Sequence, residues 1–226
     1  LQQVLSETYE VRPLELTSGV VPGDVDVLIV ANPQGMTDPE VFALDQFLMR
    51  GGSAIVAGGQ FALAQPSQMG IQVMPVDTGL DAALHAYGLA VGNRVVLDER
   101  NAPFPTPVIR DLGGFRVRAV QLGDCPPFID VRPDQMDRDN PALAGLPGLV
   151  LHWASPVTVV AEPAEDGPVY ATLLSSSDRA WAQSAFQAAP DFEAHPDFGY
   201  AHGISTEQFP LAQAVVIISA IPREMA

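Results

Sequence analysis

The chain has 226 residues, of which 47% are hydrophobic, enough to bury a substantial core in one large domain. Its formal net charge is −16 and all eleven basic residues are arginines, so binding to nucleic acid phosphates or an anionic lipid surface is not expected. A single cysteine, Cys125, excludes an internal disulfide and any zinc cluster built from cysteines. No apolar stretch approaches the length of a membrane span, and the two chain ends suggest a soluble piece of a longer protein.

The clearest structural signal is a strand–helix–strand pattern near the N-terminus. Residues 25–31 form a near-continuous apolar run, typical of a strand buried on both faces. A helix is predicted to begin after Thr37, which forms a capping-box pattern with Glu40, and to end at the glycines 51–52. Residues 53–57 indicate a second short buried strand. Together these elements predict a right-handed parallel βαβ unit.

The rest of the chain predicts one more helix and several strands. The helix lies between residues 80 and 87, and strands are expected at residues 9–16, 94–98, 115–120, 149–153, 157–161, 169–174 and 214–219. Residues 62–75 are predicted to form a loop or flap. The stretch 99–139 is predicted to be a loop-rich insertion or small second lobe. We therefore expect a single α/β domain over residues 1–226, with a mostly parallel sheet and helices on both faces.

Polar residues follow three of the predicted strands. Ligands of open parallel sheets bind beyond the carboxyl ends of the strands, so we predict a polar rim there that holds a sugar or a peptide. The predicted ligand-binding residues are Asn32, Gln34, Gly59, Gln60, Ser176 and Asp178. Turns and helix caps need the same residue types, so a purely structural role is the alternative.

The motifs of covalent and phosphoryl-transfer catalysis are missing from the sequence. Cys125 is followed by two prolines, which prevent the helix start that a nucleophile elbow requires. Because the chain has no lysine and no glycine-rich phosphate motif, nucleotide hydrolysis is excluded and no cofactor is expected. The competing class is a glycan or peptide hydrolase with strand-end carboxylates, for which Asp98 and Asp178 are the candidates.

One loop contains candidate metal ligands. His195 and His202 flank Asp197, and two imidazoles with a carboxylate are the donors that zinc prefers. Their spacing matches no structural or catalytic zinc pattern, so we predict no metal site.

Several segments, taken in order, resemble the auxiliary extracytoplasmic domain of GldG-type ABC transport systems, the gliding-motility group. The resemblance includes Asp-Val-Leu-Ile-Val-Ala-Asn-Pro at 26–33 and Leu-Leu-Ser-Ser-Ser-Asp-Arg-Ala-Trp at 173–181. Its other segments are residues 43–52, 84–91, 95–98, 140–141 and 145–147. Together they span about residues 20–181.

This resemblance implies a fold and a role. The fold would be similar to that of class I glutamine amidotransferases, flavodoxin-like and without their catalytic residues, as in intraflagellar transport proteins, where the domain serves assembly. The full-length protein would be membrane-anchored on the periplasmic side of the bacterial inner membrane, beside an ABC permease and an ATPase. We therefore expect a non-enzymatic auxiliary role in complex assembly or ligand sensing, with a glycan or peptide as the candidate ligand.

Overall fold

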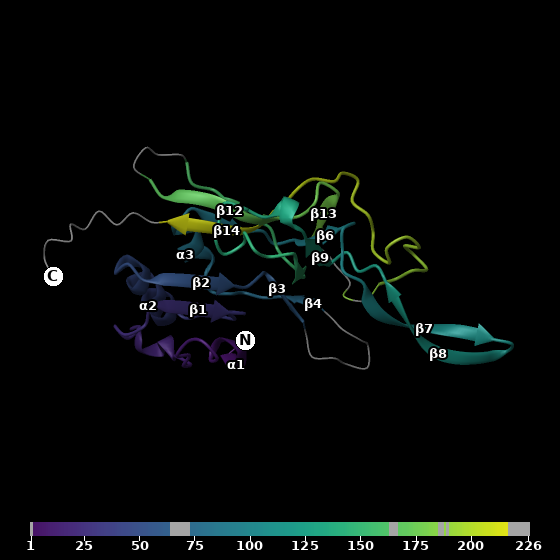
Figure 1. Ribbon diagram of the computed structural model, residues 1–226, viewed down its shortest axis with the longest axis horizontal. Helices are drawn as coiled ribbons and strands as arrows, with labels where there is room; N and C mark the ends of the chain where they lie inside the picture. The colour runs from purple at the N-terminus through teal and green to yellow at the C-terminus, as the bar shows by residue number, and fades with distance from the viewer. Residues whose placement is uncertain (1, 64–72, 163–166, 185–187, 189, 217–226) are drawn as a thin grey trace, which may run out of the picture. The chain divides into compact units, whose positions relative to one another are not determined.

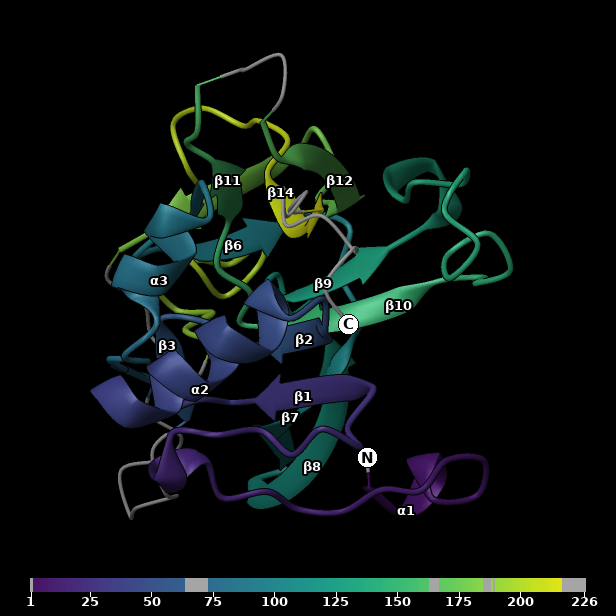
Figure 2. The ribbon, with the colours of Figure 1, turned by 90° about the vertical axis from the view of Figure 1, so that its left-hand side faces the viewer.

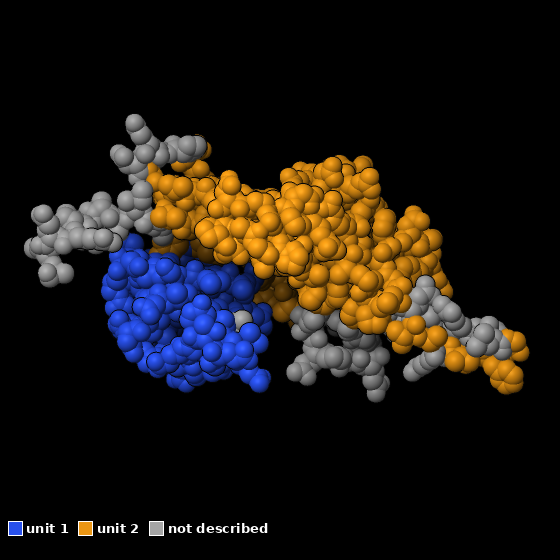
Figure 3. All heavy atoms as spheres, viewed as in Figure 1, with its two compact units in different colours: residues 1–58, 78–83, 219–226 blue, residues 59–77, 84–218 orange. Residues whose placement is uncertain are grey.

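The chain divides into two compact units (Figure 3). The computed structural model describes residues 2–63, 73–162, 167–184, 188 and 190–216. Unit 1 contains residues 1–58, 78–83 and 219–226, and unit 2 contains residues 59–77 and 84–218. Helix α3 (Asp81–Ala86) begins in unit 1 and ends in unit 2.

Unit 1 is built on the βαβ unit that the sequence predicts. Strands β1 (Val27–Ala31) and β2 (Ser53–Ala57) pair in parallel, each residue of β1 opposite one of β2. Helix α2 (Asp38–Met49) connects them and runs along the pair (Figure 2). Gly51, with φ +88°, follows the helix in the left-handed conformation expected at its end. The predicted strand–helix–strand unit is therefore confirmed.

Only one face of this pair is buried. Leu44 and Phe47 of α2 are buried, as is Leu28 of β1, whereas Ile29 and Ile55 are exposed. Side chains alternate between the two faces of a strand, so the exposed isoleucines lie opposite to the buried leucine. The expectation that the first strand is buried on both faces is wrong, because a single helix covers a single face, and the second strand is mostly exposed as well.

The segment before β1 is largely irregular. It contains helix α1 (Gln2–Leu5) and the short 3₁₀ helix η1 (Leu16–Ser18). The strand predicted at residues 9–16 is absent from these described residues. Pro13, which lacks an N–H group, is poorly suited to a strand ladder.

The start of α2 is closed by a capping box. The backbone N–H and the hydroxyl of Thr37 each donate to the Glu40 carboxylate at 2.8 Å, so this predicted motif is confirmed. The backbone bond and then the hydroxyl bond lower the pKa of Glu40.

Loss of this cap has a measurable cost. We expect Thr37→Ala to lower the free energy of unfolding by about 1 kcal/mol in urea titrations at neutral pH. The folded-state pKa of Glu40 lies below its unfolded value of 4.5. The cap therefore stabilises the folded state above that pH, and this stabilisation is lost as the pH falls. The cost of Thr37→Ala should therefore shrink in acid. Gln46→Ala, on the exposed side of α2, is the control and should change stability by less than about 0.5 kcal/mol.

Unit 2 is built from pairs of strands (Figure 1). The strands are β3 (Phe61–Leu63), β4 (Val73–Pro75), β5 (Leu89–Val91), β6 (Val95–Asp98), β7 (Phe104–Leu112), β8 (Phe115–Gly123), β9 (Phe128–Val131), β10 (Leu149–His152), β11 (Val157–Val159), β12 (Val169–Ser175), β13 (Ala180–Gln183) and β14 (Pro210–Val216). A 3₁₀ helix, η2 (Pro133–Gln135), follows β9. The pairs are β3–β4, β5–β11, β6–β13, β7–β8, β9–β10 and β12–β14, and each is antiparallel.

The predicted fold class is wrong. Among the described residues only β1 and β2 pair in parallel, so the chain is not a mostly parallel three-layer sheet with helices on both faces, of amidotransferase or flavodoxin type. Parallel strands need a long crossover, usually a helix, and α2 is the only described helix that provides one. The stretch 99–139, predicted to be loop-rich, contains three strands, and its role as an insertion stays a prediction.

Strand β6 is the most deeply buried strand of unit 2. Val95 and Leu97 belong to one hydrophobic cluster with Trp181 and Tyr200, and Val96 points to the other face, into a second cluster. That second cluster contains Ile129, Val131, Met136, Leu174, Ala180, Phe209 and Leu211. The strand predicted at residues 94–98 is confirmed, and the structure shows that it is buried. Within the described ranges, every helix falls short of the length and apolarity of a membrane span.

Candidate functional site

A buried carboxylate ends strand β6. The side chain of Asp98 is 0% exposed. Its Oδ1 accepts hydrogen bonds from the Ser177 hydroxyl at 2.5 Å and from the Arg100 backbone N–H at 2.8 Å. Its Oδ2 accepts one from the Ser177 backbone N–H at 2.7 Å. Three donors from the chain itself thus satisfy the buried carboxylate, which anchors the turn between β12 and β13 to the end of β6.

The same turn is tied to the start of β14 by a second serine. Ser176 is fully buried. Its backbone N–H donates to the Phe209 carbonyl at 2.8 Å, and its hydroxyl accepts from the Phe209 N–H at 2.8 Å. The hydroxyl also donates to the Ser177 carbonyl at 3.0 Å. Ser176, predicted to bind a ligand, is therefore occupied by structural bonds.

A partly exposed polar layer covers this buried anchor. Glu99 accepts a hydrogen bond from the Arg179 guanidinium at 3.1 Å, and its other carboxylate oxygen lies 3.3 Å from Nε2 of His202. The His202 ring packs on Trp181 with ring centroids 4.3 Å apart. The Trp181 indole N–H donates to the Ala201 carbonyl at 3.0 Å. These contacts hold the 201–203 segment against β6 and β13.

A second ion pair extends the layer toward η2. The Arg100 guanidinium donates to both carboxylate oxygens of Asp134, at 2.9 and 3.1 Å, and to Gln135 at 2.9 Å. The hydrogen bond from Arg100 lowers the pKa of Asp134. Because both charged side chains are exposed, solvent screening keeps the contribution to stability small.

The pair of carboxylates that the hydrolase alternative requires is not available in this cluster. In the hydrolase alternative Asp98 would act with Asp178, but Asp98 is fully buried and its oxygens are engaged, so it cannot contact a substrate. The hydroxyl of Ser177 donates to a carboxylate and not to a histidine base. In the part of the chain that the structure describes, no three His, Cys, Asp or Glu side chains gather to hold a metal.

The predicted rim residues fall in both units. Asn32 and Gln34 lie in unit 1, both exposed, and Asn32 has φ +50°. Gly59 and Gln60 lie in unit 2, where the Gln60 N–H donates to the Ser155 hydroxyl at 3.4 Å. Ser176 and Asp178 belong to the cluster at the end of β6, where Asp178 is exposed. Ligand binding by the six residues stays a prediction.

Sequence reasoning missed most of the exposed layer. Glu99 and Arg100 directly follow a predicted strand, and the strand-end rule could have identified them. The sequence pattern around His202 indicates only metal binding. Its contact with Glu99 joins residues 103 positions apart, and no local pattern signals such a pair.

A buried thiol and phenol lie deeper in unit 2. Burial raises the pKa of Cys125 to about 11, an effect that its hydrogen bond with Tyr200 partly opposes. Burial also raises the pKa of Tyr200, and the nearby thiol adds to the shift. The phenol hydroxyl donates to the Ala188 carbonyl at 3.0 Å. Both groups therefore hold their protons more tightly in the folded protein than in the unfolded chain.

This pair predicts a loss of stability in alkali. In the unfolded chain the thiol ionises near pH 9.0 and the phenol near pH 10.0. Their contribution to the free energy of unfolding is therefore fully present below pH 9.0 and is lost as the pH rises from there toward about 11. Because the chain has no lysine, few other side chains titrate in this range. Urea unfolding at a series of pH values should show the decline, with a shallower slope in Cys125→Ala. A flat profile would contradict the burial argument.

A comparison with known protein families connects the chain to transport. No curated protein and no solved structure matches the chain. Residues 1–215, nearly the whole chain, match the model of a family described as an ABC-type uncharacterized transport system. The chain therefore belongs to this family, as an auxiliary component of an ABC transport system.

Proposed function

We propose that this chain is a non-enzymatic auxiliary domain that acts in assembly of an ABC transport complex on the extracytoplasmic side of the membrane. The observation that carries the proposal is the family match over residues 1–215. The engagement of Asp98, Ser176 and Ser177 in structural bonds supports a binding role, since it occupies the side chains best placed for chemistry. The partners are the permease and the ATPase of the same system.

The resemblance supports two finer proposals. The system belongs to the GldG-type gliding-motility group, and the full-length protein is anchored in the inner membrane with this domain in the periplasm. Protease added to spheroplasts, in which the inner membrane is still closed, should cleave the domain as it cleaves a periplasmic marker. Protection until the cells are lysed would place the domain in the cytoplasm instead.

The assembly role is tested with the full-length protein in its native membranes. After chemical crosslinking and affinity purification, the permease and the ATPase should be recovered with the wild-type protein. A tagged membrane protein of similar abundance from another transport system is the control. Recovery of neither subunit, under conditions that recover the permease with its own ATPase, would contradict the proposal.

A ligand-sensing form of this role would use the exposed members of the predicted rim. Asp178 is the best candidate, because it is exposed beside the charged layer at the end of β6. Cell-wall oligosaccharides and short peptides can be screened by thermal shift. A stabilising ligand should lose its effect with Asp178→Ala, whereas retention of the full effect would remove Asp178 from the site.

A further inference from the structure

Strands β7 and β8 form a long hairpin that extends from the rest of unit 2 (Figure 1). A two-residue turn connects them, with φ +65° at Gly113 and +91° at Gly114. Positive φ at both positions defines the turn type that matches the twist of a hairpin. A Cβ added at either glycine would meet nothing within 4 Å, so the tip lies in open space.

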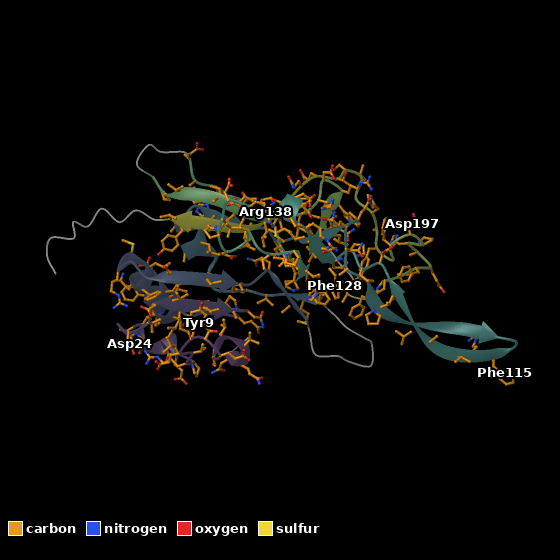
Figure 4. The ribbon with its side chains drawn as sticks, viewed as in Figure 1. Tyr9, Asp24, Phe115, Phe128, Arg138 and Asp197 are labelled. Carbon is orange, nitrogen blue, oxygen red and sulfur yellow. The ribbon has the colours of Figure 1, made fainter. Side chains whose placement is uncertain are left out.

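The hairpin displays large apolar side chains along β8. Phe115, at the far end (Figure 4), is 76% exposed, and Val120 and Leu122 are 72% and 68% exposed. Val117 is also exposed. By the alternation of side chains, Phe115 and Val117 lie on one face of β8, and Val120 and Leu122 lie on the other. Isolated exposed apolar residues are ordinary, but two such pairs on one nine-residue strand indicate that another molecule covers it.

The two outer edges of the hairpin differ. Residues of paired antiparallel strands alternate between those that exchange ladder hydrogen bonds and those whose N–H groups point outward. The pair next to a two-residue turn is hydrogen-bonded, so Pro107, opposite Val120, and Pro105, opposite Leu122, occupy outward positions. Proline has no N–H, and these two residues protect the edge of β7 against a further strand.

The edge of β8 has no such protection. Its outward positions are residues 116, 118, 120 and 122, and each has a backbone N–H group. Among the described residues β8 pairs with β7 alone. The exposed apolar side chains and the unprotected edge therefore lie on the same strand, and this combination is typical of strand addition.

Charge indicates which kind of strand the edge receives. Residues 104–123 contain three arginines and one aspartate, a net charge of +2, whereas the other 206 residues carry −18. Arg116, at an outward position of β8, is exposed. Two hairpins of like charge repel each other, so an acidic strand suits the edge better than β8 of a second copy.

We infer that the outer edge of β8 receives an extended segment of the permease, one that alternates apolar residues with aspartate or glutamate and adds a third strand to the hairpin. The inference rests on the proposed assembly role and names the surface through which that role is carried out. Backbone hydrogen bonds supply affinity, and the apolar and arginine side chains select the sequence of the segment.

The test uses the full-length protein and the detergent-purified permease–ATPase complex of the same system. Val120→Pro removes an outward N–H, as Pro107 does on the opposite strand, and should weaken binding at least about tenfold. Val120→Thr keeps the N–H with a side chain of similar shape and is the matched control, expected to weaken binding by less than about threefold. Raising the salt concentration from about 50 to about 500 mM should also weaken the wild-type interaction, because salt screens the attraction between the arginines and the acidic segment.

Hydrogen exchange on the wild-type protein tests the same inference without a substitution. Amide exchange over residues 115–122 should slow at least about tenfold in the complex, because outward N–H groups become bonded. Binding without this protection, or equal binding by wild type and Val120→Pro, overturns the inference and leaves the assembly role standing. No binding by the wild type overturns both.

Two other occupants of the edge give distinct results. Protection of residues 115–122 by anionic phospholipid vesicles, and not by the permease complex, would assign the hairpin to the membrane surface. Concentration-dependent dimerisation that Val120→Pro abolishes would assign it to a second copy of the chain. Either result overturns the inference.

Discussion

Asp98→Ala should lower the free energy of unfolding by about 3–5 kcal/mol, because it leaves three donors, two of them buried, without an acceptor. These donors are the Ser177 hydroxyl, the Ser177 backbone N–H and the Arg100 backbone N–H. For a chain of this length the loss corresponds to a fall of roughly 10 °C in the midpoint of thermal unfolding. Calorimetry or circular dichroism measures it directly.

Two control variants separate the anchor from general effects of charge. Asp178→Ala removes an exposed carboxylate from the same turn and should change stability by less than about 0.5 kcal/mol. Ser177→Ala removes one of the three donors and should cost about 1–2 kcal/mol. Equal effects of Asp98→Ala and Asp178→Ala would show that the buried bonds do not hold the turn.

Trp181→Ala should cost about 3–5 kcal/mol, the largest packing loss we expect in unit 2. The indole is 1% exposed and packs with Val95, Leu97 and Tyr200. It also supports the His202 ring, so the substitution removes the platform beneath the 201–203 segment. Urea unfolding measures the loss of stability, and hydrogen exchange of residues 201–203 measures the loosening of this segment.

A conservative variant divides the two contributions of this tryptophan. Trp181→Phe keeps most of the buried apolar surface but loses the hydrogen bond to the Ala201 carbonyl. It should therefore cost only about 1–2 kcal/mol, with faster exchange at residues 201–203 than in the wild type. If the phenylalanine variant were as unstable as the alanine variant, the hydrogen bond rather than packing would dominate.

The parts of the fold that the sequence predicts well are those that depend on near neighbours. The capping box joins residues three positions apart, and Gly51 ends the same helix that Thr37 begins. The strands on either side of α2 are close along the chain, so the connecting helix determines that they pair in parallel. Local hydrogen bonding and short chain closure leave few alternatives for such a segment.

The pairing of the later strands depends on residues that are distant in the sequence. The apolar run of β6 predicts burial but contains no information on the direction of its partner, β13, which begins at Ala180. Burial on both faces of a strand is typical of a parallel sheet. Strand β6 is buried on both faces although its pairing is antiparallel, because Trp181 covers one face and the cluster around Ile129 covers the other. The predicted fold class is therefore wrong, although the strand itself is predicted at the correct residues.

The βαβ unit, the position of strand β6 and the lack of nucleophile and phosphate motifs follow from the sequence without the structure. Only the tertiary structure decided what the polar strand ends do. Ser176, predicted to bind a ligand, forms structural bonds to Phe209, and Asp98 accepts a hydrogen bond from Ser177, 79 positions away. A serine or aspartate that binds a ligand and one that closes a turn are the same residue type, so the sequence does not distinguish them. The difference lies in which hydrogen-bonding partners folding brings to the side chain.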